Sequence, residues 1–261
     1  MSDRELLDLA TDAARKAGEL LLDHFHRPAR GVEAKSTPTD LVSDADRASE
    51  DLIVGLIRRR RPRDGILAEE GDDDASESGL RWVVDPLDGT VNFLFRLPEW
   101  SVSIAVEDQE GTRVALIHNP NRNETFTAIR GSGAELNSKP ISVSGKTALA
   151  EALIGTGFAY DARARSAQSE TLAMVLPRVR DIRRAGSAAI DLSSLACGRF
   201  DGFYEAPMER WDRAAGELLI AEAGGVVTDL PAPFGLSTGV IAANPALHDQ
   251  LRELVLPDGR I

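Results

Sequence analysis

The sequence predicts a layered fold of mixed α+β and α/β character, in which helices and sheets alternate as α-β-α-β-α. Two patterns predict it: two amphipathic helices and a run of strands in the first half, then alternating strands and helices in the second half. There is no internal repeat or low-complexity linker among the 261 residues. We therefore expect a single domain, 1–261, with a soft boundary near residue 140 between a helix and antiparallel-sheet lobe (1–140) and an α/β lobe (141–261).

Two helices are predicted at the start of the chain. Residues 3–26 carry apolar side chains at helical spacing, among them Leu6, Leu9 and Ala13, and Pro28 ends the pattern. A second helix is predicted from a cap at Ser43 or Asp44 to about residue 60. The apolar faces of both helices indicate that they cover one side of a sheet.

The strands of that sheet follow the second helix. Strands are predicted over 65–68, 81–84, 101–107, 113–118 and 124–129, with a solvated polar loop over 72–79. Asp85-Pro86 is expected to end the second strand. The last three strands are separated only by turn residues, so they are predicted to form an antiparallel meander.

The second half alternates between strands and helices. The predicted order is strand 153–156, helix 166–179, strand 182–184, helix 187–197, strand 202–204, helix 212–223, strands near Val226 and Val240, and a helix over about 245–254. The glycine-containing segments 131–133 and 155–157 lack the rest of a dinucleotide or P-loop motif, so we interpret them as turns or strand ends.

Charge and cysteine content exclude several classes of protein. Forty-two Asp and Glu against 30 Lys and Arg give a net charge of −12, which disfavours non-specific binding to nucleic acid or to an anionic membrane. A single cysteine, Cys197, excludes an internal disulfide framework. Because there is no apolar signal region and no run of 18 apolar residues, we expect a cytoplasmic protein without a membrane span.

The segment Asp85-Pro86-Leu87-Asp88-Gly89-Thr90 carries the clearest chemical signal. A turn at Pro86 can aim the two carboxylates and the Leu87 carbonyl at one point, and such oxygen ligands suit Mg²⁺. Gly89 permits a close backbone approach, and free N–H groups at a helix start can hold an anion. Taken alone, the segment is also typical of an ordinary capped turn.

Further carboxylates occur at the ends of predicted elements. Glu69-Glu70 follows the strand 65–68, and Asp212 lies at the start of the helix 212–223. Each is by itself typical of a solvated edge or of a helix N-terminus.

Together these segments resemble the inositol monophosphatase family of Mg²⁺-dependent, lithium-sensitive phosphatases. Their order and spacing extend over nearly the whole chain, and the resemblance implies the fold of that family. The segments that carry it are 35–36, 39–46, 68–70, 82–93, 186–189, 211–212 and 222–225.

The resemblance implies two Mg²⁺ ions, or three, per site. Glu69, Asp85 and the Leu87 carbonyl would hold the first, and a weaker third ion would lie near Glu69. Asp85, Asp88 and Asp212 would hold the second. The positive ions would then make a locally negative cleft suitable for a phosphate dianion.

The resemblance also implies the catalytic groups. Beside Glu69, a hydrogen-bonded pair of Thr90 and Asp46 would orient a water molecule and help to deprotonate it. That water would attack phosphorus directly, without a phosphoenzyme. Backbone N–H groups of Gly89 and Thr90 would bind the phosphate.

On the substrate side, the resemblance implies Glu205 as an acceptor for polyol hydroxyl groups. Lys35 corresponds to the family's lysine near the metals, and either Arg183 or Arg184 could face the substrate. The remaining substrate-binding positions implied by the family are Gly186, Ser187 and Ala188.

The expected activity is hydrolysis of inositol 1-phosphate or a similar small polyol phosphate by a homodimer. Histidinol phosphate and fructose 1,6-bisphosphate are alternative substrates on the same scaffold, and 3′-phosphoadenosine 5′-phosphate fits the motifs less well. A regulatory or interaction role in RNA-related processes is an alternative of another class, although direct nucleic-acid binding is not expected.

Overall fold

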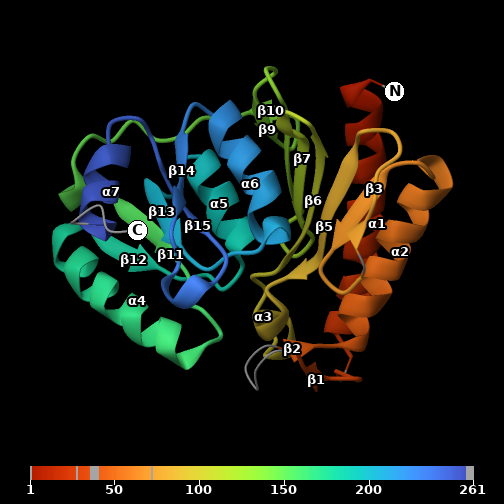
Figure 1. The fold of residues 1–261 in the computed structure, drawn as a ribbon, viewed down its shortest axis with the longest axis horizontal. Helices are drawn as coiled ribbons and strands as arrows, with labels where there is room; N and C mark the ends of the chain where they lie inside the picture. The colour runs from red at the N-terminus through yellow and green to blue at the C-terminus, as the bar shows by residue number, and fades with distance from the viewer. Residues whose placement is uncertain (1, 28, 36–40, 72, 257–261) are drawn as a thin grey trace.

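The computed structural model describes residues 2–27, 29–35, 41–71 and 73–256, and it has five layers. Helices α1 and α2 cover the outer face of a large sheet, α5 and α6 lie between that sheet and a smaller one, and α4 and α7 cover the far side (Figure 1). This arrangement confirms the predicted α-β-α-β-α fold class. Pro28, Ser36, Thr39, Asp40 and Asp72, which entered the predictions above, lie outside the described residues.

Helices α1 (Asp3–Phe25) and α2 (Asp44–Arg60) begin at serine caps, as their sequences require. Ser2 and Glu5 form one capping box, and Ser43 and Asp46 form the other. The second box places Asp46 at the end of α2 that faces the motif at residues 85–90.

The large sheet contains eight strands in the order β10-β9-β8-β7-β6-β5-β3-β4. All neighbours pair antiparallel except β3 and β5, which are parallel. The bounds are β3 Gly65–Ala68, β4 Asp73–Asp74, β5 Arg81–Asp88, β6 Ser101–Asp108, β7 Gly111–Asn119, β8 Glu124–Ile129, β9 Ala134–Leu136 and β10 Lys139–Pro140.

Two predictions about this sheet are wrong. Strand β5 does not end before Asp85 but continues to Asp88, because its pairing with β6 shifts register between Asp85 and Asp88, where Pro86 lacks an N–H group. Asp73-Asp74 is not loop but a short edge strand paired with β3, and acidic side chains are compatible with an exposed sheet edge.

The smaller sheet is mixed, with the order β12-β11-β13-β15-β14. Its strands are β11 Leu153–Thr156, β12 Asp181–Arg183, β13 Gly202–Glu205, β14 Val226–Leu230 and β15 Gly239–Ala243. Strand β11 pairs parallel with β12 and β13, while β15 pairs antiparallel with β13 and β14.

The helices of this half are α4 Ala162–Val175, α5 Ala188–Ala196, α6 Arg210–Glu222 and α7 His248–Val255. The predicted bounds of α4, 166–179, are wrong at both ends. Asp161 caps the helix by accepting hydrogen bonds from the N–H groups of Arg163 and Ala164, and a 3₁₀ turn containing Pro177 follows Val175.

Several short elements carry too few residues for a periodic signal. They are the β1–β2 hairpin (Glu33–Ala34 and Leu41–Val42), helix α3 (Thr90–Leu94), strands β9 and β10, and the 3₁₀ turns η1 Leu149–Glu151, η2 Leu176–Arg178 and η3 Pro233–Gly235.

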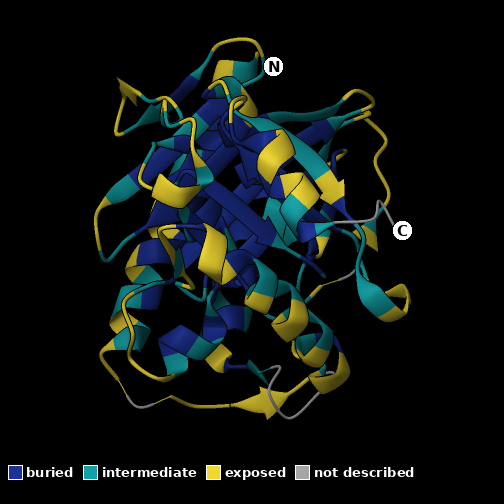
Figure 2. Ribbon diagram, turned by 90° about the vertical axis from the view of Figure 1, so that its left-hand side faces the viewer, coloured by how far each residue is buried: buried dark blue, intermediate teal, exposed yellow. Residues whose placement is uncertain are grey.

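Alternate strand residues supply separate cores to the layers. On β5, Trp82 and Val84 pack toward α1 and α2, whereas Val83 joins the core around α5 and α6. A third core, which includes Ile154 and Leu251, lies under α4 and α7. The central strands are therefore buried in the middle of the molecule, and the exposed residues lie on turns, outer helix faces and edge strands (Figure 2). Within the described ranges, no helix is long and apolar enough to cross a membrane.

Candidate active site

The parallel pairing of β3 and β5 brings Glu69 and Asp85 to the same edge of the large sheet. Ala68 pairs with Val84, and the N–H group of Glu69 donates to the Val84 carbonyl at 3.3 Å. Glu69 and Asp85 each come directly after one of these paired residues, so their carboxyl groups lie side by side although they come from separate segments.

The irregular end of β5 fixes the groups between Asp85 and Asp88. The Leu87 N–H group donates to Asp85 Oδ1 at 3.0 Å, and the Ser49 hydroxyl of α2 donates to the Pro86 carbonyl at 2.8 Å. Gly89 then has φ of +96°, and a Cβ atom there would lie 2.9 Å from the Glu99 carbonyl oxygen. The turn into α3 therefore requires glycine.

Thr90 and Asp46 are in direct contact, although 44 residues separate them. The Thr90 hydroxyl lies 2.8 Å from Asp46 Oδ1 and 3.1 Å from the Leu87 carbonyl oxygen. Asp46 is fully buried and also accepts hydrogen bonds from the Ser43 backbone at 2.9 Å and hydroxyl at 2.6 Å. Burial raises the pKa of Asp46, and these hydrogen bonds oppose the rise.

Asp88, the last residue of β5, lies against the N-terminus of α5, and Asp212 lies in the first turn of α6. Asp88 accepts hydrogen bonds from the Ser187 hydroxyl and from the N–H groups of Ala188 and Ala189, at 3.2 and 2.8 Å. Asp212 accepts a hydrogen bond from the Glu209 N–H group at 2.6 Å. The N-termini of α5 and α6 therefore direct both acids to one region.

The electrostatics of this region are dominated by buried acids. Burial raises the pKa of Asp85 well above its usual range, and Glu69, Asp88 and Asp212 raise it further by repulsion. The pKa of Asp212 rises for the same reasons, burial first and then Glu69 and Asp88. Burial raises the pKa of Glu69 to about 7, although Lys35 opposes the rise.

Lys35 supplies a positive charge to this cluster. Its ammonium group lies 2.7 Å from Glu69 Oε1 and also contacts the Glu70 carboxylate. Burial of the ammonium opposes its charge, but Glu69 and Glu70 outweigh that effect and raise the pKa of Lys35.

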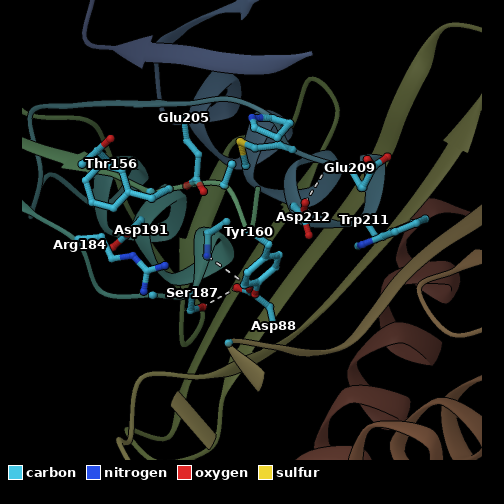
Figure 3. Close-up of a pocket in the computed structure, with 18 of the residues that line it drawn as sticks. Asp88, Thr156, Tyr160, Arg184, Ser187, Asp191, Glu205, Glu209, Trp211 and Asp212 are labelled. Atoms are coloured by element: carbon cyan, nitrogen blue, oxygen red, sulfur yellow. Dashed lines mark hydrogen bonds between the residues drawn. The ribbon is translucent and has the colours of Figure 1, made fainter. Parts of the chain in front are cut away.

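A cavity of about 350 Å³ opens over the cluster, between the ends of the two sheets (Figure 3). Many of the predicted site residues line it, while Asp46, Asp85, Leu87 and Thr90 are buried behind its wall. The predicted residues that line the cavity are Lys35, Glu69, Asp88, Gly89, Gly186, Ser187, Ala188, Glu205 and Asp212.

The acids suit a divalent cation for two reasons: their carboxylate oxygens are suitable ligands, and their negative charges repel one another in the absence of a cation. Within the part of the chain that the structure describes, no three His, Cys, Asp or Glu side chains stand grouped around one point as a metal site. Glu69, Asp88 and Asp212 instead contact protein donors. The donors are nevertheless carboxylate oxygens, which Mg²⁺ prefers, and their mutual repulsion is what a cation would relieve.

Sequence reasoning missed Asp191 and could not choose between Arg183 and Arg184. Arg184 and Asp191 both line the cavity, while Arg183 does not. Asp191 is 1% exposed, and burial together with Glu205 raises its pKa to about 8. Its position one helical turn after Ser187 is a signal that could have placed it on the same helix face.

The class of fold is therefore a five-layered α-β-α-β-α protein with an acid-lined cavity between its two sheets. Residues 2–258 match the inositol monophosphatase family, and the chain belongs to that family. The predicted resemblance is thereby confirmed.

Individual relatives cover almost the whole chain. Nus factor SuhB of Escherichia coli (strain K12) is 40% identical over 244 residues, 92% of this chain and 91% of the relative. Inositol-1-monophosphatase of Rhizobium meliloti (strain 1021) is 39% identical over 262 residues, 98% and 97% of the two chains.

Solved structures agree with this assignment. Extragenic suppressor protein suhB from Bartonella henselae has a TM-score of 0.90 at 37% identity, covering 96% of this chain and 98% of the other. Inositol monophosphatase from Anabaena (Nostoc) sp. PCC 7120 has a TM-score of 0.85 at 35% identity, covering 97% and 96%.

Proposed function

We propose that the protein is a Mg²⁺-dependent phosphomonoesterase that hydrolyses inositol 1-phosphate or a similar small polyol phosphate to the free alcohol and phosphate. The observation that carries the proposal is the gathering of four mutually repelling acids, Glu69, Asp85, Asp88 and Asp212, in or directly behind the wall of one cavity. Membership of the inositol monophosphatase family supports the reaction class.

The proposed Mg²⁺ ligands are Glu69, Asp85 and the Leu87 carbonyl for one ion, and Asp85, Asp88 and Asp212 for a second, with a third ion near Glu69. Bound Mg²⁺ supplies positive charge for the phosphate and lowers the pKa of a water molecule. Asp212 and Glu69 each use one carboxylate oxygen in their hydrogen bonds with Glu209 and Lys35, so the other oxygen of each would be available to an ion.

Thr90, Asp46 and Glu69 are the proposed catalytic groups. Because the Thr90 hydroxyl donates its proton to Asp46, its oxygen can accept a hydrogen bond from the attacking water. The Glu69 carboxylate is close enough to Asp46 to interact with it electrostatically. Thr90, Asp46 and Glu69 would together orient the water and help to remove its proton.

Backbone N–H groups at Gly89 and Thr90 are proposed to bind the phosphate oxygens, with Lys35 nearby. Gly186, Ser187, Ala188 and Glu205 would contact the alcohol portion of the substrate, since all four line the cavity. We further propose a cytoplasmic, lithium-sensitive homodimer; the exposure of two nearby apolar side chains, Phe95 at 71% and Leu97 at 50%, supports self-association.

The proposal predicts phosphate release only in the presence of Mg²⁺. Purified protein should be assayed with inositol 1-phosphate, histidinol phosphate, fructose 1,6-bisphosphate and 3′-phosphoadenosine 5′-phosphate, each with Mg²⁺ and with EDTA. The highest kcat/KM is expected with inositol 1-phosphate. Full activity in EDTA would contradict the proposal. A higher kcat/KM with one of the other three substrates would identify that compound, instead of inositol 1-phosphate, as the preferred substrate.

Replacement of Gly157 by alanine is expected to raise KM for inositol 1-phosphate about tenfold, which corresponds to about 1.4 kcal/mol. A Cβ atom at Gly157 would overlap the Glu205 carboxylate, so that acid must move away from the substrate. Gly145→Ala is the matched control, because a Cβ atom there meets nothing within 4 Å. Steady-state kinetics with both variants test the prediction, and equal KM values would show that Glu205 does not contact the substrate.

A regulatory role is the second candidate function. Relatives named Nus factor SuhB are 40% identical to this chain over 92% of its length, which favours an interaction partner in RNA-related processes. Binding of an RNA or an RNA polymerase subunit by both the wild type and Asp88→Asn would support this role. Failure of both proteins to bind would remove it.

A further inference from the structure

The guanidinium group of Arg184 is an uncommitted cation in the wall of the substrate cavity. In the residues that the structure describes, it makes no ion pair or hydrogen bond at contact distance. Figure 3 shows it beside Asp191, on the same side of the cavity as Glu205 and above Ser187. A cation in such a position is available to a ligand.

The neighbouring arginine is committed elsewhere. Arg183 Nη1 lies 2.7 Å from Asp181 Oδ2 and 2.8 Å from the Ile182 carbonyl oxygen, at the edge strand β12. Both arginines line a second cavity of about 280 Å³, but only Arg184 also lines the wall of the substrate cavity. The two consecutive arginines therefore differ in their hydrogen bonds and in access to the substrate cavity, which makes Arg183 a control for Arg184.

The backbone that carries Arg184 is held from two sides. The Asn92 amide of α3 donates to the Ala185 carbonyl at 2.8 Å, and the Ala185 N–H group donates to Asp191 Oδ2 at 3.4 Å. A Cβ atom at Gly186 would lie 2.7 Å from Arg184 Nη1, so the guanidinium packs directly over this glycine. The backbone that follows Arg184 is therefore held beside the cavity, and the exposed side chain of Arg184 lies over Gly186.

The groups around Arg184 alternate in hydrogen-bonding character. Burial raises the pKa of Glu205 to about 8, Arg184 opposes that rise, and Asp88 adds to it. Arg184 also opposes the rise in the pKa of Asp191. A guanidinium offers only donors, whereas a carboxyl group offers acceptor oxygens whether or not it is protonated. A hydroxyl group can both donate and accept a hydrogen bond. Adjacent hydroxyl groups of a substrate can therefore accept from Arg184 and donate to Glu205.

We propose that Arg184 is a specificity-determining residue, whose guanidinium group donates hydrogen bonds to hydroxyl oxygens of the substrate's alcohol portion while Glu205 accepts from them. The inference rests on the proposed phosphatase function, because it requires the phosphate to lie at the acid cluster. The positive charge of Arg184 favours phosphate esters of neutral polyhydroxy alcohols over those of cationic alcohols, because its own contribution to the interaction with an ammonium or imidazolium group is repulsive.

The test compares Arg184→Ala with Arg183→Ala on three substrates in Mg²⁺: inositol 1-phosphate, histidinol phosphate and 4-nitrophenyl phosphate. We expect Arg184→Ala to raise KM for inositol 1-phosphate about tenfold, the loss of about one charged hydrogen bond, with little change in kcat. It should leave kcat/KM for 4-nitrophenyl phosphate within about twofold and that for histidinol phosphate equal or higher. Arg184→Lys should recover part of the loss, because it keeps the charge without the planar fork.

The outcomes separate the two proposals. An equal loss with all three substrates, or an equal effect of Arg183→Ala, would overturn the specificity role of Arg184 while leaving a phosphatase. Absence of Mg²⁺-dependent phosphate release by the wild type from any of the three would overturn the proposed function itself. Circular dichroism and gel filtration of each variant separate a specific loss from misfolding or altered assembly.

Discussion

Asp85→Asn is expected to reduce Mg²⁺-dependent phosphate release about a thousandfold, which corresponds to about 4 kcal/mol of transition-state stabilisation. Asp85 is the one acid proposed to ligate both ions, so its replacement removes charge from both. The fold should persist, because an asparagine oxygen can still accept the hydrogen bond that Leu87 N–H donates at 3.0 Å. Initial rates at saturating Mg²⁺, beside circular dichroism spectra, measure the loss.

The same substitution is expected to stabilise the protein in EDTA. Burial, Glu69, Asp88 and Asp212 all disfavour a negative charge at Asp85, so a neutral amide relieves repulsion in the metal-free state. Loss of activity with a raised Tm in EDTA distinguishes removal of a metal ligand from damage to the fold. A lowered Tm would indicate a structural role instead.

Asp191→Asn provides a matched control for this comparison. Asp191 is also a buried acid with a raised pKa, but it is outside the proposed Mg²⁺ ligands. Both variants should raise Tm in EDTA, whereas only Asp85→Asn should lose the further rise in Tm on addition of Mg²⁺. A Mg²⁺ response that survives in Asp85→Asn, together with activity, would contradict the ligand assignment.

Local sequence signals were sufficient where the chemistry lies within one segment. The Asp85–Thr90 segment indicated a turn with two acids, and the hydrophobic periodicity indicated α1 and α2. The end of β5 was mispredicted because the proline was expected to stop the strand, whereas a register shift against β6 accommodates it. Such a shift depends on the partner strand, which a local pattern does not contain.

Contacts between distant segments were accessible only through the family resemblance or the structure. The hydrogen bond between Asp46 and Thr90 joins residues 44 positions apart, and the motif resemblance alone suggested it. The choice between Arg183 and Arg184 required the position of edge strand β12 relative to α5. Those side chains are one residue apart, so only the tertiary arrangement distinguishes their environments.

The metal-free protein is expected to become less stable as the pH rises from about 6.5 to 8.5. Glu69, with a pKa of about 7, and Asp191 and Glu205, each with a pKa of about 8, carry more protons in the folded state than in the unfolded chain, where such groups titrate near pH 4. Their favourable contribution is complete at low pH and is lost as each group ionises, so the free energy of unfolding falls with rising pH.

His118 acts in the opposite direction at lower pH. Burial lowers its pKa, so its contribution to stability is lost as the pH falls below its usual value near 6.5. The fall caused by the acids should therefore be clearest above pH 6.5.

Urea denaturation in EDTA at pH 6.5, 7.5 and 8.5 measures this dependence, and we expect a decrease of about 3 kcal/mol across the series. Saturating Mg²⁺ should reduce the slope, because a bound cation favours the ionised form of Glu69. The Glu205→Gln substitution should reduce the slope in EDTA, without Mg²⁺, because the substitution removes one of the three ionising groups. A metal-free stability that is constant or rises over this range would show that the acids ionise without cost, and the electrostatic argument for a cation at this cavity would then fail.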